Sequence, residues 1–375
     1  MPKQAVLLGA GHAHLYTIKR AAEFARRGHE LTVVSPDLFW YSGLATGMLG
    51  GFYPPVLDQV DVAALTRRGG GRFVCDRVAG LDRHARRVIL AQGAVLHFDA
   101  LSINLGSEPP PITGAVADDE RIFAVKPIRR LWKLRRAVEK RLAETSSQRL
   151  RIVVAGGGAT ACEIAANLEH LVRAEAGTAE IVVLAAGDDL LSQLPRGAAR
   201  KVERALTGRG IRFRREARVE RIEAGRAVTG GGPPEPFDFF VNATGLRPAP
   251  MIENLGLPVD DSGAMLVDRC LRSVGDAAIH GGGDCVAFQG RELPRIGVYA
   301  IRQAPILYAN LLAALDGDAP VQFAPQRRFL WILNLGDGTG VAARGRFYWH
   351  GRLAFRLKDW IDRRFLREYQ HAARS

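Results

Sequence analysis

The chain has 375 residues, of which 47% are hydrophobic and 24% are charged, an ordinary composition for a globular protein with two or three cores. No run approaches the about 18 consecutive apolar residues that a membrane-spanning helix needs, so we expect no such helix. The N-terminal residues lack the charged and apolar regions of a secretory signal. The net charge is +13 and the isoelectric point is near 10.1, but no nucleic-acid-binding motif accompanies this charge. The four cysteines lie far apart in the sequence, so their spacing excludes a dithiol redox pair and fits a protein of the reduced cytoplasm. They also form no zinc-ligand pattern, so we expect no metal site.

The first motif is AVLLGAGHAH at residues 5–14. An apolar strand at 6–8 turns at Gly9 into a helix that is expected to run through residue 25 and to end at Gly28, and a second strand follows at 31–34. Gly11 would let a pyrophosphate approach the backbone at the start of this helix. His14 replaces the third glycine of the pattern, which predicts looser packing of the helix on the strand, and Ser35 stands where an acid usually binds the ribose. An ordinary strand-to-helix turn is the alternative.

Residues 98–106 then form an expected strand that ends in small residues, and the proline-rich exit at 107–111 marks a crossover between domains. A charged amphipathic helix follows at 127–144 and is interpreted as scaffold.

The second motif is RIVVAGGGATACE at residues 151–163. Gly156, Gly158 and Ala161 occupy its three positions, a helix follows, and a strand is expected at 181–184. Ala185 stands in the place of the ribose-binding acid, and no arginine follows it immediately, which slightly favours NADH without deciding between NADH and NADPH.

The chain returns to the first domain after a third apolar strand. Residues 237–250 contain this strand, a small-residue turn that ends at Gly245, and two prolines. A short strand at 277–279 then runs into HGGGDC, which places Asp284 at an expected helix start. This carboxylate is either a helix cap or a group that binds a flavin ribityl hydroxyl.

Residues 353–370 form an expected basic amphipathic helix. Its apolar stripe consists of Leu357, Trp360, Ile361, Phe365, Leu366 and Tyr369, with Lys358, Arg363, Arg364 and Arg367 around it. Such a helix either lies on a membrane surface or docks on its own domain or on a second subunit, and both interpretations stay open.

The order GAGHAH, GGGATACE, ATG and GGGDC resembles the pyridine nucleotide-disulfide oxidoreductase superfamily. Three further stretches, YSGLATGMLGGFYPP, RIGVYAIRQAPILYANL and KDWIDRRF, resemble type II NADH dehydrogenase-like proteins, above all the oxidoreductase domain that precedes selenide, water dikinase in some organisms. Sulfide:quinone oxidoreductases are a more distant resemblance, and their catalytic cysteines cannot be placed here.

The resemblance implies an α/β fold with two Rossmann-like dinucleotide-binding domains and a small C-terminal α+β region. The FAD-binding domain would comprise residues 1–110 and 246–320, the inserted NAD(P)H-binding domain residues 111–245, and the C-terminal region with its basic helix residues 321–375.

The resemblance also implies which residues bind the cofactors. The residues expected at FAD are Gly9, Gly11, His12, Ala13, Ser35, Tyr41, Gly106, Gly283, Asp284 and Tyr299. Those expected at the nicotinamide cofactor are Gly156, Gly158, Thr160 and Gly245.

Glu163, Lys126 and Gln303 are the catalytic candidates that the resemblance implies. Glu163 matches an acid that faces the nicotinamide pocket, Lys126 belongs to a KP dipeptide beside the flavin, and Gln303 belongs to the quinone motif. In that motif, Gly297 and Arg302 stand where glutamines are expected. A helix-start carboxylate for Glu163, a solvated lysine for Lys126 and core tyrosines for Tyr41 and Tyr299 are the alternatives.

The implied reaction passes a hydride from NAD(P)H to FAD and then electrons to an acceptor, with a quinone as the expected one. Two alternatives stay open: a reductase of a small acidic electron-carrier protein, and a flavin- and nucleotide-binding module without turnover that is linked to selenium metabolism. The expected location is the cytoplasm, with contact to the inner face of the membrane and homodimer formation left open.

Overall fold

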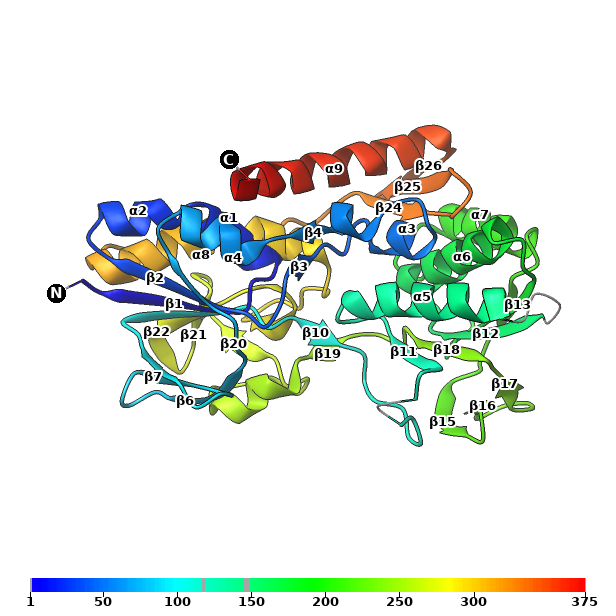
Figure 1. Cartoon of the computed structure of the whole chain (residues 1–375), viewed down its shortest axis with the longest axis horizontal. Coiled ribbons are helices and arrows are strands. Elements are labelled where there is room, and N and C mark those ends of the chain that lie inside the picture. Colours follow the sequence, from blue (N-terminus) through cyan, green and yellow to red (C-terminus); the bar gives the residue numbers. More distant parts are fainter. Residues whose placement is uncertain (1, 117–118, 145–148, 375) are drawn as a thin grey trace.

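The computed structural model describes residues 2–116, 119–144 and 149–374. It is a mixed α/β fold with one large sheet in each half and a small sheet in the C-terminal region (Figure 1). This arrangement confirms the fold class expected from the sequence.

The first large sheet has eight strands, and its centre is parallel. In spatial order its strands are β23 (Val286–Phe288), β20 (Met265–Val267), β21 (Arg272–Ser273), β22 (Asp276–Gly281), β9 (Ala100–Ile103), β1 (Gln4–Leu8), β2 (Glu30–Val34) and β5 (Arg72–Val74). Since successive side chains of a strand point to opposite faces, Leu7 joins one core cluster while Val6 and Leu8 join another. Both faces of β1 are therefore buried, and its sequence shows no polar alternation.

Helices cover one face of this sheet, and a small antiparallel sheet packs on the other. The helices are α1 (His12–Lys19), α2 (Ala21–Arg26), α4 (Val62–Arg68) and α8 (Gly297–Asp316), and the small sheet consists of β6 (Val78–Asp82), β7 (Arg87–Leu90) and β8 (Val95–His97). In Figure 1 these helices lie above the sheet, and β6 and β7 lie below it.

Two expectations about the first helix are wrong. The helix does not run unbroken, because Arg20 leaves helical geometry (φ −107°, ψ 22°) and separates α1 from α2. His14 does not loosen the packing either, because it is fully buried and its ring contacts the Gly9 carbonyl at 2.6 Å and the Ser102 hydroxyl at 2.8 Å. The imidazole therefore links α1 to β9 through its contact with Ser102. A glycine at this position would only allow the helix to approach the strand closely.

The second large sheet has five parallel strands. Their order is β11 (Ile122–Ala124), β18 (Phe239–Asn242), β12 (Leu150–Ala155), β13 (Ala179–Leu184) and β14 (Arg212–Arg214), and the helices beside it are α5 (Arg129–Glu144), α6 (Ala159–Ala174) and α7 (Arg196–Thr207). The strands and helices expected around the second glycine motif are all present.

The two crossovers between the halves lie side by side. The short strand β10 (Ser107–Glu108) pairs antiparallel with β19 (Arg247–Pro248). Strands β20 to β23 then join the sheet that contains β1. The domain limits at residues 110, 245 and 320 stay a prediction.

The C-terminal region forms the sheet β24 (Trp331–Asn334), β25 (Gly340–Arg344) and β26 (Phe347–Gly351), followed by the long helix α9 (Arg352–Arg374). Figure 1 shows α9 lying along the top of the molecule, with its C-terminal end above α1 and α4 and its N-terminal end at β26, toward the second half. Its apolar stripe is divided, since Leu366 and Tyr369 are buried whereas Trp360 is 51% exposed. The helix therefore docks on its own chain with one part of the stripe and presents the other part to the outside.

Among the described residues, α8 is the one helix that is long and apolar enough to cross a membrane by length and composition, although the sequence was expected to contain none. It holds Arg302 and a proline, and 56% of its apolar window is buried. Because α8 packs against α1 and β9, its apolar composition is that of a core helix.

Candidate cofactor and acceptor sites

The first glycine turn lies directly against Asn104, which follows β9. Gly9 has φ +85°, and a Cβ built there would lie 2.3 Å from the Asn104 carbonyl oxygen; a Cβ on Gly11 would lie 2.2 Å from Asn104 Oδ1. A larger residue at Gly9 would force a backbone shift, and one at Gly11 would displace the Asn104 side chain. Gly11 begins α1 without a side-chain cap of its own, and because the Ala13 N–H donates to Asn104, the N–H groups of Gly11 and His12 are the ones left for a pyrophosphate.

Asn104 is a site residue that the sequence did not reveal. Its Oδ1 accepts a hydrogen bond from the Ala13 N–H at 3.2 Å, and its Nδ2 donates to the Gly282 carbonyl at 2.7 Å. It therefore ties the first glycine turn to the GGGDC loop, two segments that are far apart in the sequence. A single asparagine after an apolar strand carries no pattern that would have identified it.

Gln303 and Tyr299 lie on α8 behind this loop. Gln303 is buried, and its Oε1 accepts a hydrogen bond from the Gly283 N–H at 2.7 Å. Tyr299 is also buried, and its hydroxyl donates to the Gln326 carbonyl at 3.1 Å. Both side chains thus hold neighbouring loops in place.

Asp284 lies between two partners that hold it as a carboxylate. Ser107 donates a hydrogen bond to its Oδ2 at 2.7 Å, and the Lys126 ammonium forms an ion pair with the same oxygen. Burial raises the pKa of Asp284, but the charge and hydrogen bond of Lys126 outweigh burial, so that the net pKa lies below its usual value. The prediction that a helix starts at Asp284 is wrong. Asp284 lies within the single 3-10 turn Gly283–Cys285, and the chain then continues as β23.

His12 and Tyr41 form an aromatic cluster beside the first turn. The His12 ring lies 4.9 Å from Phe39 and 5.4 Å from Tyr41, while Tyr41 stacks on Phe365 of α9 at 4.9 Å. Burial, followed by the charge of Lys126, lowers the pKa of His12 to about 4, so this imidazole is neutral at pH 7. Ser35 is buried at the end of β2, and Gly106 precedes β10 in the crossover.

The second glycine turn repeats the geometry of the first. Gly156 has φ +138°, and a Cβ built there would lie 2.2 Å from the Ala243 carbonyl oxygen at the end of β18. Gly158 begins α6 without a side-chain cap, and both Thr160 and Gly245 are exposed beside it. The turn, the start of α6 and the β18 end therefore leave an open backbone cradle of the kind that a dinucleotide needs.

An arginine does reach the loop after β13, from a neighbouring strand. The Arg215 guanidinium donates to the Asp188 carbonyl at 2.9 Å and pairs with the carboxylate of Glu203. Arginine side chains near this position of the fold accommodate a 2′-phosphate. The choice between NADH and NADPH therefore stays open, and the slight preference for NADH stays a prediction.

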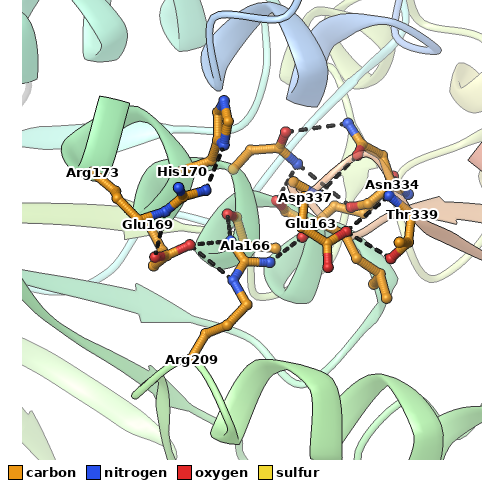
Figure 2. A network of polar contacts seen from close by, with 12 residues as sticks. Glu163, Ala166, Glu169, His170, Arg173, Arg209, Asn334, Asp337 and Thr339 are labelled. Carbon is orange, nitrogen blue, oxygen red and sulfur yellow. Dashed lines mark hydrogen bonds and ion pairs between the residues drawn. The ribbon is translucent and has the colours of Figure 1, made fainter. Parts of the chain in front are cut away.

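Glu163 lies one turn into α6 and faces the C-terminal region (Figure 2). Its Oε1 accepts a hydrogen bond from the Asn334 N–H at 2.7 Å. Burial raises the pKa of Glu163, and the charge of Lys358 acts in the opposite direction. Glu163 is therefore held at a junction between the second half and the C-terminal sheet.

The same figure shows how the junction is fastened. The Asn334 amide donates to Asn167 Oδ1 at 3.1 Å, and Arg209 bridges the carboxylate of Glu169 and the carbonyls of Ala166 and Leu335. These contacts join three separate parts of the chain, so no local sequence pattern could predict them.

A pocket of about 400 Å³ lies between α8, α9 and the segment that leads into β24. Its apolar walls include Phe329, Leu330 and Ile361, and Arg302 and Lys358 add positive charge. This size is that of an ordinary small-molecule site. Arg302, at a position where the resemblance expected glutamine, lines the pocket, whereas Gln303 does not.

Lys358 and Asp362 form the inner wall of this pocket. The Lys358 ammonium donates to Asp362 Oδ2 at 2.8 Å and to the Gly43 carbonyl, and the Tyr41 hydroxyl donates to Asp362 Oδ1 at 2.8 Å. Burial lowers the pKa of Lys358, but the carboxylates of Asp362 and Glu163 outweigh burial and raise it, so the ammonium stays charged. The helical pattern of the sequence predicts Lys358 only on the polar side of a surface helix. It does not predict that Asp362 accepts hydrogen bonds from both Lys358 and Tyr41.

The four cysteines are free, with Cys75 exposed and the other three buried. Burial raises the pKa of Cys285 to about 11, so this thiol beside Asp284 packs rather than reacts. Within residues 2–116, 119–144 and 149–374, no group of three or more histidine, cysteine or acidic side chains could hold a metal ion.

Residues 3–304 match the family model described as pyridine nucleotide-disulphide oxidoreductase. Among characterised proteins, the demethylphylloquinone reductase NdbB of Synechocystis is 25% identical over 368 residues, which cover 90% of this chain and 87% of NdbB. Among solved structures, NDH2 of Plasmodium falciparum in complex with NADH superposes with a TM-score of 0.81 at 14% identity and 99% coverage of both chains.

The sulfide:quinone oxidoreductase of Aquifex aeolicus superposes with a TM-score of 0.82 at 16% identity, over 99% of this chain and 92% of that one. At these identities the two structures show the fold alone, while the family match carries the chemistry. The resemblance to type II dehydrogenases is confirmed, and the link to selenide, water dikinase stays a prediction. The chain therefore belongs to the pyridine nucleotide-disulphide oxidoreductase family and is an oxidoreductase that uses FAD and NAD(P)H.

Proposed function

We propose that this protein reduces a quinone, which binds in the pocket between α8, α9 and β24. The observation that carries the proposal is the pocket itself, which combines apolar walls from Phe329, Leu330 and Ile361 with the buried Lys358 and Asp362. A quinone needs this combination, because its ring and tail are apolar and its oxygens take up protons. The similarity to NdbB supports the same acceptor class.

The cofactor roles follow from the geometry of the two glycine turns. Gly9, Gly11, His12 and Ala13 would hold the FAD pyrophosphate at the start of α1, and Asp284 would accept a hydrogen bond from the ribityl chain. Lys126 keeps Asp284 ionised and correctly placed. Gly156, Gly158 and Thr160 would hold the pyrophosphate of NAD(P)H, and Glu163 would face its nicotinamide end. FAD supplies the hydride-accepting ring; this chain supplies placement and charge.

The face around the pocket would rest on a membrane, which is where quinones dissolve. Its exposed apolar residues come from β26 and α9: Phe347, Trp349, Leu353, Trp360 and Ile361. Exposed arginines surround them, at positions 344, 346, 352, 356 and 364. Aromatic and basic side chains together bind the interface of an anionic bilayer. The inner, cytoplasmic leaflet fits this charge; formation of a homodimer stays a prediction.

The first test is an anaerobic titration with NADH and with NADPH, followed by addition of a water-soluble quinone. Bleaching of the flavin absorption by one nicotinamide and its return on quinone addition would support the proposal. Both nicotinamides are needed because Arg215 lies near the loop after β13. A reduced flavin that no quinone reoxidises would contradict the choice of acceptor.

Blocking the pocket makes this test specific. Leu330→Trp is expected to raise the KM for quinone while the flavin is still reduced by NAD(P)H at the original rate, because Leu330 lines the pocket and is 37% exposed. Val95→Trp is the matched control, since Val95 is 49% exposed on β8 and does not line the pocket. Equal effects of both variants would contradict the assignment of the pocket.

A basic groove favours a second acceptor, a small acidic electron-carrier protein. The groove of about 1310 Å³ runs along α5, and its cationic lining residues are Arg77, Arg121, Arg129, Arg130, Lys133, Arg136, Lys140, Arg141, Arg151 and Arg226. Four acids, Asp119, Glu120, Glu144 and Asp238, oppose them. Such a surface attracts an acidic partner at low salt. The groove and the pocket share no lining residue, so salt would suppress reduction of a carrier but not of a quinone.

A further inference from the structure

Asp58 is a buried carboxyl group without a hydrogen-bond partner. The residue is 0% exposed, and among the described residues neither of its side-chain oxygens has a hydrogen-bonding partner. It ends the short 3-10 turn Pro55–Asp58 that precedes α4. A buried ionised carboxylate in this state is strongly unfavourable, whereas a protonated carboxylic acid is tolerated more easily.

The groups around Asp58 strengthen this conclusion. Its backbone carbonyl accepts the Tyr41 N–H at 2.8 Å, and Asp362 and Lys358 of α9 are close enough for their charges to affect it. Burial, followed by the carboxylate of Asp362, raises the pKa of Asp58 well above its usual value, although Lys358 acts in the opposite direction. With Glu163 nearby, one ammonium faces three buried carboxyl groups. Asp58 is the one among them to which no described group donates a hydrogen bond, so it is the one that burial favours in the neutral form.

Asp58 is linked to the acceptor pocket through the groups beside it. Lys358 and Asp362 line the pocket, and both interact electrostatically with Asp58 behind them. The Tyr41 hydroxyl donates to Asp362, and the Tyr41 ring belongs to the aromatic cluster beside the first glycine turn. Because neither Asp58 oxygen is hydrogen-bonded to these groups among the described residues, a proton passes from Asp58 to the pocket only when the Asp58 side chain turns toward one of them or a water lies between them.

We propose that Asp58 stores the proton that the acceptor takes up from the protein when it is reduced in this pocket. The inference rests on the proposed quinone reductase function. In the net reaction NAD(P)H provides two electrons and one proton, and a quinone needs two electrons and two protons to become a quinol. The second proton comes from the protein: a Lys358 N–H bond breaks as an O–H bond forms on the quinone oxygen, and the Asp58 O–H bond then breaks as its proton restores the Lys358 ammonium. The Asp58 carboxylate then regains a proton from solvent once the quinol has left.

The variant Asp58→Asn tests the proposal, because an asparagine has nearly the shape of the neutral acid but holds no transferable proton. With a quinone as acceptor, we expect reoxidation of the reduced flavin to slow by about 100-fold, the usual scale of a lost proton donor. With hexacyanoferrate(III), which accepts one electron and no proton, we expect the rate of the wild type. Flavin reduction by NAD(P)H should also be unchanged.

Asp61→Asn is the matched control. Asp61 lies three residues further along, is exposed, and caps α4 by accepting the Ala64 N–H at 2.8 Å, a role that asparagine retains. It should behave as wild type with both acceptors. If Asp58→Asn reoxidises with quinone as fast as the control, or slows equally with hexacyanoferrate(III), Asp58 stores no proton for the reaction.

Infrared spectroscopy gives a measurement that does not depend on turnover. The oxidised wild type should show the carbonyl stretch of a protonated carboxylic acid at neutral pH, and Asp58→Asn should lack it. Absence of this band from the wild type would overturn the inference. Failure of the proposed function is distinguishable from both results, because then the wild type itself would reduce no quinone.

Discussion

At the scale of single residues, the polar groups of the FAD site depend on partners that hold their charge state. Asp284 stays ionised only because Lys126 and Ser107 outweigh its burial. Burial lowers the pKa of His14 to about 4, although the hydrogen bond to the Gly9 carbonyl acts in the opposite direction. Asp284 would therefore lose its ionised state if Lys126 were removed while the burial remained.

Asp284→Asn is expected to weaken FAD binding by about 10- to 100-fold, because hydrogen bonds to a charged group contribute about 1.5–3 kcal/mol. The measurement is release of FAD on dilution, followed by flavin fluorescence. Asp261→Asn is the control, since Asp261 is an exposed acid of the same half. Unchanged FAD retention in Asp284→Asn would remove Asp284 from the site.

At the scale of elements, each glycine turn works because a strand end lies directly behind it. The carboxyl end of β9 meets the first turn through Asn104, and that of β18 meets the second through Ala243. This repetition puts both helix starts, of α1 and α6, where ligands collect at the edge of a parallel sheet. The two turns can therefore be damaged separately.

Gly156→Ala should yield a protein that keeps its FAD but is bleached slowly or not at all by NAD(P)H. The added Cβ would lie 2.2 Å from the Ala243 carbonyl at a φ of +138°, so the turn must shift. Stopped-flow absorbance measures the bleaching rate. Gly80→Ala serves for comparison, because its Cβ would meet Ile89 at an ordinary 3.7 Å. A normal bleaching rate in Gly156→Ala would show that this turn does not hold the cofactor.

The helix α9 has two parts with different predicted functions. Leu366 is 2% exposed, so Leu366→Ala should lower the free energy of unfolding by about 2–4 kcal/mol without affecting membrane binding. Leu353 is 73% exposed, so Leu353→Ser should leave stability within about 0.5 kcal/mol of wild type but reduce sedimentation with anionic vesicles. Urea unfolding and vesicle sedimentation separate the two effects. Vesicle binding that is insensitive to Leu353→Ser would contradict the membrane assignment of this face.

At the scale of the whole molecule, three histidines make the fold sensitive to acid: His14 and His280, which are buried, and His12, which is half-buried. Burial lowers the pKa values of His12, His14 and His280 to about 4 each. The unfolded chain, with ordinary values near 6.5, binds more protons between pH 6.5 and 4 than the folded chain does. Their contribution to stability is therefore complete above pH 6.5 and is lost as the pH falls toward 4.

The expected loss is at most about 1.4 kcal/mol per pH unit for each histidine. Asp58 acts with the opposite sign, because its raised pKa makes the folded state bind the extra proton. Urea midpoints of Asp58→Asn, measured from pH 7 to pH 5, should accordingly fall more steeply than those of the wild type. Parallel curves for the two proteins would contradict the assigned charge state of Asp58.

The sequence by itself determined the class of the fold, the two glycine turns and the cofactors, because these depend on local patterns: apolar strands, turns that require glycine, and helix starts. It could not determine how distant segments meet. Asn104, Asp58 and Asp362 carry no local pattern, and Gln303 sits in a recognisable motif but supports a loop instead of lining the pocket.

The tertiary structure decided these points, and also that α9 covers its own chain with Leu366 while leaving Leu353 exposed. The physical reason is that burial and charge pairing depend on which segments pack together. The charge state of a buried carboxyl group depends on neighbours that lie hundreds of residues away, as that of Asp58 depends on Asp362 and Lys358 of α9.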